Sequence, residues 1–446
     1  MIDGISRNNR KRCDSTLTKP NVIVIYCDDL GYGDLGCYGS DAIRTPHLDA
    51  LAQDGARFTN WYSNSPVCSP SRAALLTGKY PAKTGVSHIL GGKRGTGGLR
   101  DDAKTLAQRL KEHDYRTALF GKWHLGSAEE TKPNAKGFDE YFGFQAGCVD
   151  YYSHIFYWGM PSVNPVHDLW SNGEEVWRDG EYLTHLITDK SVDFIEASRA
   201  ADKPFFLYAA YNAPHYPMHA PEKYMNRYSH LPRDRQLMAA MISAVDDGVG
   251  NIVAALKRVG AYEDTIIFFS SDNGPSSESR NYLDGTEDVY YGGSAGIFRG
   301  HKGSLFEGGI REPAILVYPS KIAAEQTKDD VGMMADIVPT VMDLAGLPVP
   351  AAEEIDGSSI VPMLTQKAGT PHQQICWEYG SQLAIREGKW KLVLGGKLDF
   401  DRTQPDDVHL SDLEADPGER VNLKDEFPEI AQRLENDVRQ WYAALL

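Results

Sequence analysis

The segment around Cys68 combines residue types that could handle an anion. Cys68 opens the sequence C-S-P-S-R, which ends at Arg72, and the small apolar run that follows predicts a short helix closed by Gly78. Pro70 suits the first turn and Cys68 or Ser69 can cap the helix, so that free backbone N–H groups would point toward Cys68. A helix N-terminus and a nearby arginine stabilise a thiolate, which favours a cysteine nucleophile. A structural cysteine in a capped helix fits the same pattern, and the helix alone does not decide between them.

Two polar pairs follow two of the predicted strands. Asp28 and Asp29 come directly after one apolar β-branched run, and Asp272 and Asn273 come directly after another. Ligands of parallel sheets bind beyond the carboxyl ends of the strands, so both pairs are expected at the same edge. Carboxylate and amide oxygens suit calcium or magnesium rather than zinc. Either pair alone could be a turn after a strand.

The sequence C-S-P-S-R resembles the C-x-P-S-R signature of the sulfatase family. Five other segments resemble the family's further signatures in the same order: 28–29 (D-D), 121–126 (G-K-W-H-L-G), 212–215 (N-A-P-H), 271–274 (S-D-N-G) and 301–303 (H-K-G). These motifs span most of the chain, and a chance match to all six is not credible. The resemblance implies a type I, formylglycine-dependent, arylsulfatase-like enzyme that hydrolyses sulfuric esters.

The resemblance also implies cofactors. Cys68 would be oxidised to formylglycine by a formylglycine-generating or sulfatase-maturing enzyme. The aldehyde hydrate would be the nucleophile, and its second hydroxyl would let sulfate leave as the aldehyde re-forms. One Ca²⁺ ion would be bound by five residues: Asp28, Asp29, Cys68, Asp272 and Asn273.

Further roles follow from the same motifs. Arg72 and Lys122 would hold the modified cysteine and the sulfate, whereas Lys302 and His215 would contact the sulfate and the leaving oxygen. His124 is the implied base. The sequence does not apportion the role of acid between His215 and Lys302.

Bulk properties limit the partners. The chain has 446 residues and a formal net charge of −16, which argues against a nucleic acid. We find no apolar run that predicts a membrane span and no signal-peptide core at the N-terminus, so we expect no membrane partner. The chain would be cytoplasmic if it is full length, and periplasmic or secreted if a leader has been removed. Its six cysteines are scattered and predict neither a disulfide framework nor a zinc framework.

Strand and helix patterns alternate along most of the chain, which predicts an α/β fold with a mainly parallel sheet covered by helices. The resemblance implies an alkaline-phosphatase-like sheet and a smaller C-terminal antiparallel sheet with a helix. We expect a polar extension at 1–20, a catalytic domain at 21–370 and a C-terminal α+β subdomain at 371–446. The expected strands are 21–27, 116–120, 204–210, 265–271 and 314–318, and the expected helices are 102–113, 185–198, 235–259 and 426–445.

The substrate is less constrained. The aromatic segment 151–177 could face a sugar, although a packed excursion with an Asn172-Gly173 hairpin turn is favoured. The loop 276–300, which contains Arg280, is a better candidate for substrate contact. We expect a sulfated carbohydrate, of the galactose or N-acetylgalactosamine type. The alternatives are a phosphoester or phosphonate monoester hydrolase of the same superfamily, and a non-catalytic sulfoglycan-binding protein if Cys68 stays unmodified.

Overall fold

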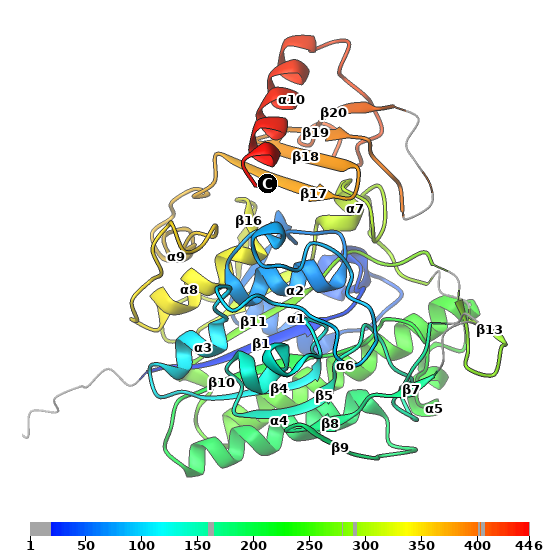
Figure 1. The fold of residues 1–446 in the computed structure, drawn as a ribbon, viewed down its shortest axis with the longest axis vertical. Helices are drawn as coiled ribbons and strands as arrows, with labels where there is room; N and C mark the ends of the chain where they lie inside the picture. Colours follow the sequence, from blue (N-terminus) through cyan, green and yellow to red (C-terminus); the bar gives the residue numbers. More distant parts are fainter. Residues whose placement is uncertain are drawn as a thin grey trace, which may run out of the picture.

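The computed structural model describes residues 19–158, 165–278, 280–288, 292–399, 402 and 406–445. Its body is a ten-stranded sheet in the order β15-β2-β14-β11-β1-β10-β4-β5-β8-β9 (Figure 1). The strands are β1 (Asn21–Cys27), β2 (Ala56–Phe58), β4 (Arg116–Lys122), β5 (Glu140–Phe144), β8 (Trp170–Ser171), β9 (Glu174–Glu175), β10 (Phe205–Ala210), β11 (Thr265–Ser271), β14 (Ala314–Val317) and β15 (Gln326–Lys328). The five central strands from β11 to β5 run parallel, and β14 is antiparallel to β11.

Helices cover both faces of this sheet. Ile23 and Ile25 of β1 pack into a core with α1 (Pro46–Gln53), α4 (Leu183–Ala200) and α6 (Arg233–Arg258). Val22 and Val24 point to the opposite face, because side chains alternate along a strand. The core there includes α2 (Cys68–Thr77), α3 (Leu106–Lys111), α8 (Ile337–Leu344) and α9 (Val361–Thr365). Burial on two faces explains why the central strands read as continuous apolar runs.

Short strands and helices lie in the segments between these main elements. They are β3 (Trp61–Tyr62), β6 (Ile155–Phe156), β7 (Val166–His167), β12 (Arg280–Asn281), β13 (Glu287–Asp288), β16 (Gly332–Met333), α5 (Glu222–Met225) and α7 (Glu307–Ile310). β6 pairs with β7 as an antiparallel hairpin that is separate from the large sheet.

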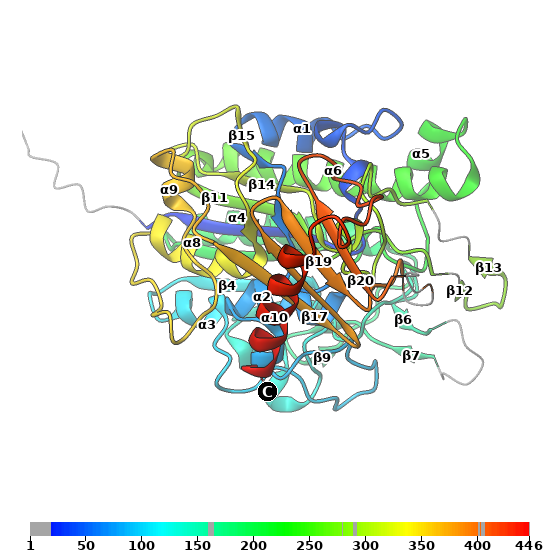
Figure 2. The same ribbon diagram turned by 90° about the horizontal axis from the view of Figure 1, so that it is seen from above.

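The C-terminal part is a four-stranded antiparallel sheet with one helix. It comprises β17 (Gln374–Tyr379), β18 (Gln382–Glu387), β19 (Trp390–Leu394), β20 (Val408–Asp412) and α10 (Pro428–Ala443), which lies over the strands (Figure 2). The sheet docks on the body through buried polar contacts as well as apolar ones. The Lys391 ammonium lies 2.8 Å from Glu307 and 3.1 Å from Glu419, and all three side chains are buried. The indole N–H of Trp377 donates to the carbonyl of Ser63 at 2.7 Å.

The structure confirms the predicted fold class, and two details differ from expectation. The helix expected at 102–113 is α3, which begins at Leu106 rather than near residue 102, because Thr105 and Gln108 form a capping box there. The N-cap of α2 is Val67, with no side-chain cap, so the prediction that Cys68 or Ser69 caps this helix was wrong. The boundary at residue 371, between α9 and β17, remains a proposal.

Two further expectations concern the membrane and the cysteines. We expected no apolar run that predicts a membrane span, but α6 is long and apolar enough to cross a membrane by length and composition. Because 72% of its most apolar window is buried inside the fold, it is placed as a core helix. The five cysteines within the described residues are all free.

Candidate active site

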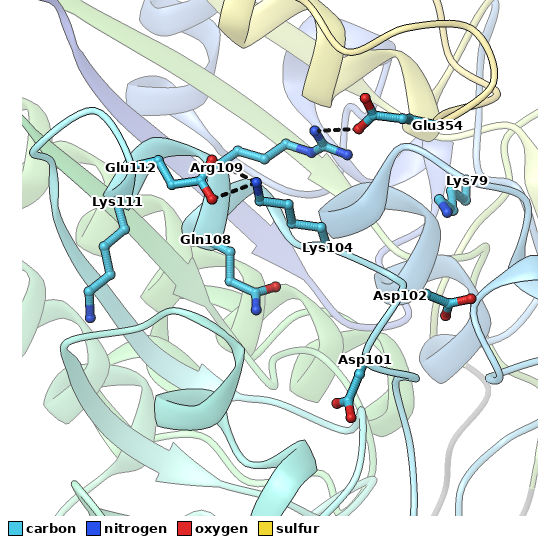
Figure 3. A pocket seen from close by; sticks show the side chains of 9 residues that line it. All are labelled: Lys79, Asp101, Asp102, Lys104, Gln108, Arg109, Lys111, Glu112 and Glu354. Atoms are coloured by element: carbon cyan, nitrogen blue, oxygen red, sulfur yellow. Dashed lines mark hydrogen bonds and ion pairs between the residues drawn. The ribbon is translucent and has the colours of Figure 1, made fainter.

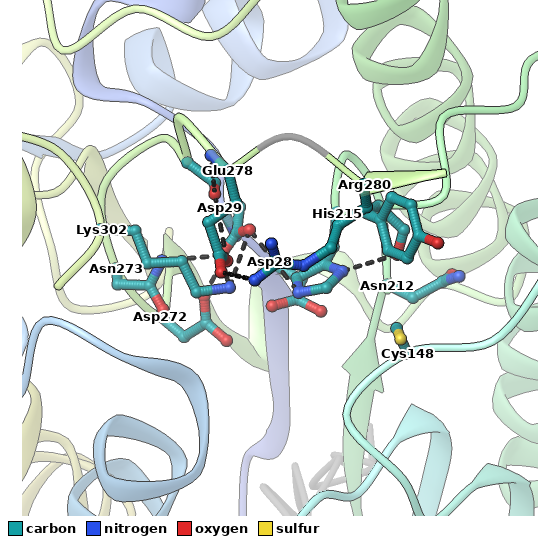
Figure 4. Close-up of polar contacts among 12 residues, drawn as sticks. Asp28, Asp29, Cys148, Asn212, His215, Asp272, Asn273, Glu278, Arg280 and Lys302 are labelled. Atoms are coloured by element: carbon teal, nitrogen blue, oxygen red, sulfur yellow. Dashed lines mark hydrogen bonds and ion pairs between the residues drawn. The ribbon is translucent and has the colours of Figure 1, made fainter. Parts of the chain in front are cut away.

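The two polar pairs lie side by side at the carboxyl edge of the sheet. β1 and β11 are parallel neighbours in which Cys27 is opposite Ser271, so the residues that follow the two strands must meet. The backbone N–H of Asp29 donates to Asp272 Oδ1 at 3.2 Å. Figure 4 shows these side chains converging with Lys302 and His215.

Three buried cations from separate elements pair with the three carboxylates at this edge. Lys122 at the end of β4 lies 2.7 Å from Asp28, and Lys302 lies 2.8 Å from Asp29. The Arg72 guanidinium, one turn into α2, lies 2.7 Å from Asp272. Because buried charges are costly unless paired, this set is mutually dependent. The structure therefore brings together residues that the sequence motifs placed in one site.

The same carboxylates fit a divalent cation. Asp28 Oδ1 and Asn273 Oδ1 are buried and have no hydrogen-bond partner among the described residues. The Asn273 amide donates its N–H to Asp29 Oδ1 at 2.7 Å, which leaves its own oxygen available as an acceptor. Ligand atoms of Asp28, Asp29, Cys68 and His215 all lie within 4.8 Å of one another. One carboxylate oxygen and one amide oxygen, neither hydrogen-bonded, beside the carboxylates of Asp29 and Asp272 suit Ca²⁺ or Mg²⁺.

Cys68 is the first residue of α2 and is buried against this cluster. Burial raises the pKa of its thiol to about 12, although Lys122 and Lys302 act in the opposite direction. The encoded thiol is therefore neutral at pH 7, and the thiolate interpretation of this helix N-terminus is not favoured.

The two histidines present defined ring nitrogens. His124 Nε2 donates to the Leu90 carbonyl at 2.9 Å, so Nδ1, which is buried without a partner, is the basic nitrogen. Gly147 makes room for this ring, since a Cβ there would lie 2.8 Å from its Cε1. His215 Nδ1 donates to the Tyr216 carbonyl at 2.6 Å. Burial lowers the pKa of both imidazoles, that of His215 to about 3.

A cavity of about 500 Å³ opens above the cluster. It is lined by Cys68, Ile89, Leu90, Gly91, Gly92, Lys93, Thr96, His124, Gly147, Phe156, Trp158, His215, Glu278 and Lys302. The Arg280 guanidinium lies 4.9 Å from the centre of the Trp158 ring. The pocket therefore combines a charged floor with an apolar and aromatic wall.

The structure places some of the candidate substrate-contact residues at this cavity and others away from it. Phe156 and Trp158 of the segment 151–177 line the cavity, whereas Tyr151 is fully buried in the core. The Asn172-Gly173 turn does connect β8 to β9. In the loop 276–300, Glu278 lines the cavity, and the tyrosines at 290–291 lie outside the described residues.

A second cavity, of about 570 Å³, lies beside α3 (Figure 3). Four of its charged side chains pair with one another, Arg109 with Glu354 at 3.2 Å and Lys104 with Glu112 at 2.6 Å. None of the motif residues lines it, so it is not a candidate for the chemistry.

Sequence reasoning missed the residues that support the motif side chains. These include Leu90 and Gly147, which orient His124, and Tyr208, whose hydroxyl lies 3.3 Å from Arg72. Glu312 is fully buried, and burial together with the charges of Asp272 and Asp29 raises its pKa well above the ordinary value. A glutamate just before an apolar strand was the one signal in the sequence for this residue.

Comparisons with known proteins identify the family. The family model described as Sulfatase matches residues 20–347, and the model described as N-sulphoglucosamine sulphohydrolase, C-terminal, matches residues 293–443. Arylsulfatase J of Mus musculus is 34% identical over 94% of this chain and 75% of its own length. N-acetylgalactosamine-6-sulfatase of Rattus norvegicus is 34% identical over 84% of this chain and 71% of its own.

Among solved structures, Ps i-CgsB superposes with a TM-score of 0.83 at 32% identity. The match covers 95% of this chain and 93% of that protein. A second structure of Ps i-CgsB, equally similar, is a complex with k-i-k-neocarrahexaose.

Proposed function

This chain belongs to the sulfatase family and is a sulfuric ester hydrolase, and we propose that its substrate is a sulfated carbohydrate. The sulfated sugar would be of the galactose or N-acetylgalactosamine type. The observation that carries this proposal is the pocket, which Phe156 and Trp158 line together with Cys68 and Lys302. Aromatic faces suit the apolar faces of sugar rings, and buried cations suit the sulfate. The names of the two comparison proteins, a sulfatase for N-acetylgalactosamine and a neocarrahexaose-bound neighbour, support the same class.

We propose that Asp28, Asp29, Asp272, Asn273 and the modified residue 68 bind one Ca²⁺ ion. When bound, the ion would offset negative charge on the sulfate oxygens. A formylglycine made from Cys68 by a maturing enzyme would supply the nucleophile.

The chain's own side chains would divide the remaining work. Arg72 and Lys122 would fix residue 68 and the sulfate from the carboxylate side. His124 Nδ1, the unpartnered ring nitrogen, would accept a proton from the group at position 68. Lys302 and His215, which both line the pocket, would contact the oxygen of the departing sugar.

Three measurements test this function. Mass spectrometry of the peptide containing Cys68, from protein made in its native cell type, should show formylglycine, and an intact thiol throughout would refute the mechanism. Parallel assays should show hydrolysis of 4-nitrophenyl sulfate in preference to 4-nitrophenyl phosphate, and a strong phosphate preference would refute the sulfatase chemistry. Among sulfated sugars, galactose and N-acetylgalactosamine sulfates should be hydrolysed faster than glucosamine sulfates. Cys68→Ala is the control for background activity.

A further inference from the structure

Three side chains outside the active site meet on the excursion between β5 and α4. His154 precedes β6, His167 ends β7, and Asp179 follows β9. One ligand atom from each residue lies within 4.8 Å of the other two. His154 is fully buried and His167 is 8% exposed, whereas Asp179 is exposed. The cluster therefore joins two interior imidazoles to a carboxylate that solvent can reach.

Each imidazole is oriented through one nitrogen and leaves the other without a partner. His167 Nδ1 donates to Glu175 Oε1 at 2.9 Å, and His154 Nε2 donates to the Glu181 carbonyl at 3.2 Å. The remaining atoms, His154 Nδ1 and His167 Nε2, are buried and make no hydrogen bond with any residue that the structure describes. Because carboxylates and carbonyls only accept, these two nitrogens carry the lone pairs of neutral rings. Metal-binding histidines are held by the same kind of outer hydrogen bond.

Packing holds both rings in place. The Trp177 ring stacks on His167 with centroids 3.7 Å apart and planes 11° apart. His154 adopts a positive φ of 56°, and its carbonyl accepts the backbone N–H of Asp168 at 2.9 Å. Few residues adopt such a φ without tertiary constraint, so the position of His154 is fixed by its surroundings.

We propose that His154 Nδ1, His167 Nε2 and Asp179 form a binding site for a divalent transition metal ion, with Zn²⁺ as the ion that suits these ligands. Two neutral imidazoles and one carboxylate are typical Zn²⁺ ligands, and water would complete a tetrahedral set. The donors differ in kind from the carboxylate and amide oxygens of the active site, which suit calcium. The ion would tie the β6–β7 hairpin to the loop after β9.

The position of the site gives it a role in shaping the pocket. His154 directly precedes β6 and His167 ends β7; β6 also carries Phe156, and Trp158 lies two residues further along the chain. A tie at the base of the β6–β7 hairpin would hold this aromatic wall over the cavity. This role rests on the proposed function of the pocket, whereas metal binding itself does not.

A second histidine–aspartate cluster provides the matched comparison. His47 groups with Asp246 and Asp247, but Asp246 accepts the backbone N–H groups of His47 at 3.2 Å and Leu48 at 2.8 Å. These bonds cap the first turn of α1, so both oxygens of the Asp246 carboxylate already have hydrogen-bond donors. His47 itself is exposed, so this cluster carries no proposal.

The test is a zinc titration of the full chain with Ca²⁺ present to saturate the oxygen site. Competition with a chromophoric chelator gives the affinity, and elemental analysis after gel filtration gives zinc per chain. We expect wild type and His47→Gln to retain one zinc that His167→Gln loses. Asp179→Asn, at an exposed position that should not disturb folding, should weaken zinc binding at least about tenfold. Zinc should raise the melting temperature of wild type but not of His167→Gln.

Three results would overturn the site. Wild type that holds no zinc in several-fold molar excess would overturn it, and so would His167→Gln that holds as much zinc as wild type. If His167→Gln does not fold, Asp179→Asn decides the test: an unchanged zinc affinity in this folded variant overturns the proposed site. Because the readout is metal content, failure here leaves the sulfatase assays unaffected, and failure of those assays leaves this result standing.

Discussion

Replacing Gly147 with alanine should slow the enzyme by moving a single imidazole. The new Cβ would lie 2.8 Å from His124 Cε1 and 3.0 Å from Nε2, whereas ordinary contact begins near 3.4 Å, so the ring must shift by about 0.6 Å. The hydrogen bond from Nε2 to the Leu90 carbonyl would then weaken, and Nδ1 would turn away from residue 68. Since a misplacement of about 1 Å can lower a rate about a hundredfold, we expect kcat to fall between about tenfold and a hundredfold, or ~1.4–2.7 kcal/mol.

The assay is steady-state hydrolysis of 4-nitrophenyl sulfate, normalised to the formylglycine content of each preparation. Gly91→Ala is the matched control, because Gly91 lines the same pocket and a Cβ there would have no atom within 4 Å. Full activity in Gly147→Ala would refute the placement of His124 as the base. Equal losses in both variants would show that filling the pocket, rather than moving the ring, is responsible.

Three more changes separate catalysis from stability. Lys302→Ala should lower kcat at least about a hundredfold in the same assay, since losing one charge-stabilising donor typically costs roughly 2.7–4 kcal/mol. Lys391→Met removes the cation 3.1 Å from the buried carboxylate of Glu419 and leaves Glu307 paired with Arg311, so it should lower the free energy of unfolding by up to about 3–5 kcal/mol, measured by urea denaturation. Burial opposes protonation of His372, but its hydrogen bond to Asp336 outweighs burial and raises the pKa above the ordinary 6.5. This pair should therefore stabilise the fold fully below about pH 6.5 and lose its effect as pH rises through the raised pKa, as melting curves across this range should show.

Each of these predictions has its own control. Near-normal turnover in Lys302→Ala would remove that residue from the site. Lys389→Met breaks a half-exposed pair with Asp412, which solvent screens, and should cost much less stability than Lys391→Met, so equal losses at 389 and 391 would contradict the argument from burial. His372→Gln should abolish the pH-dependent part of the melting temperature, and unchanged curves would contradict the assigned ion pair.

The central strands could be predicted from the sequence to within a residue or two. β1 and β11 have the predicted bounds because a strand buried on both faces must be apolar throughout, and the polar pairs that follow mark where it ends. The neighbouring parallel register then places Asp28 beside Asp272 without further information.

The support of the site could not be predicted in this way. The tautomer of His124 depends on the carbonyl of Leu90, which comes from a loop 34 residues away, and its space depends on Gly147. Loop carbonyls and glycines leave no periodic signal, because tertiary contacts rather than local preference fix their positions. The same holds for Phe156 and Trp158, because the aromatic pattern favoured a packed excursion, whereas both side chains line the cavity.

The charge balance of the site explains how an acidic chain can bind an anion. The formal net charge of the chain is −16, so long-range attraction does not favour a sulfate ester. Within the site, the negative charges of three carboxylates and the positive charges of three side chains cancel. These six residues are Asp28, Asp29, Asp272, Arg72, Lys122 and Lys302. A divalent cation bound by those carboxylates would leave the set with a net charge of +2 in a region of low dielectric, where it acts strongly on a monoanionic sulfate. The aspartates would then serve two purposes, since they pair the buried cations and also hold the charge that makes the pocket attractive to an anion. Sulfate affinity should accordingly depend on the divalent cation more steeply than the stability of the fold does.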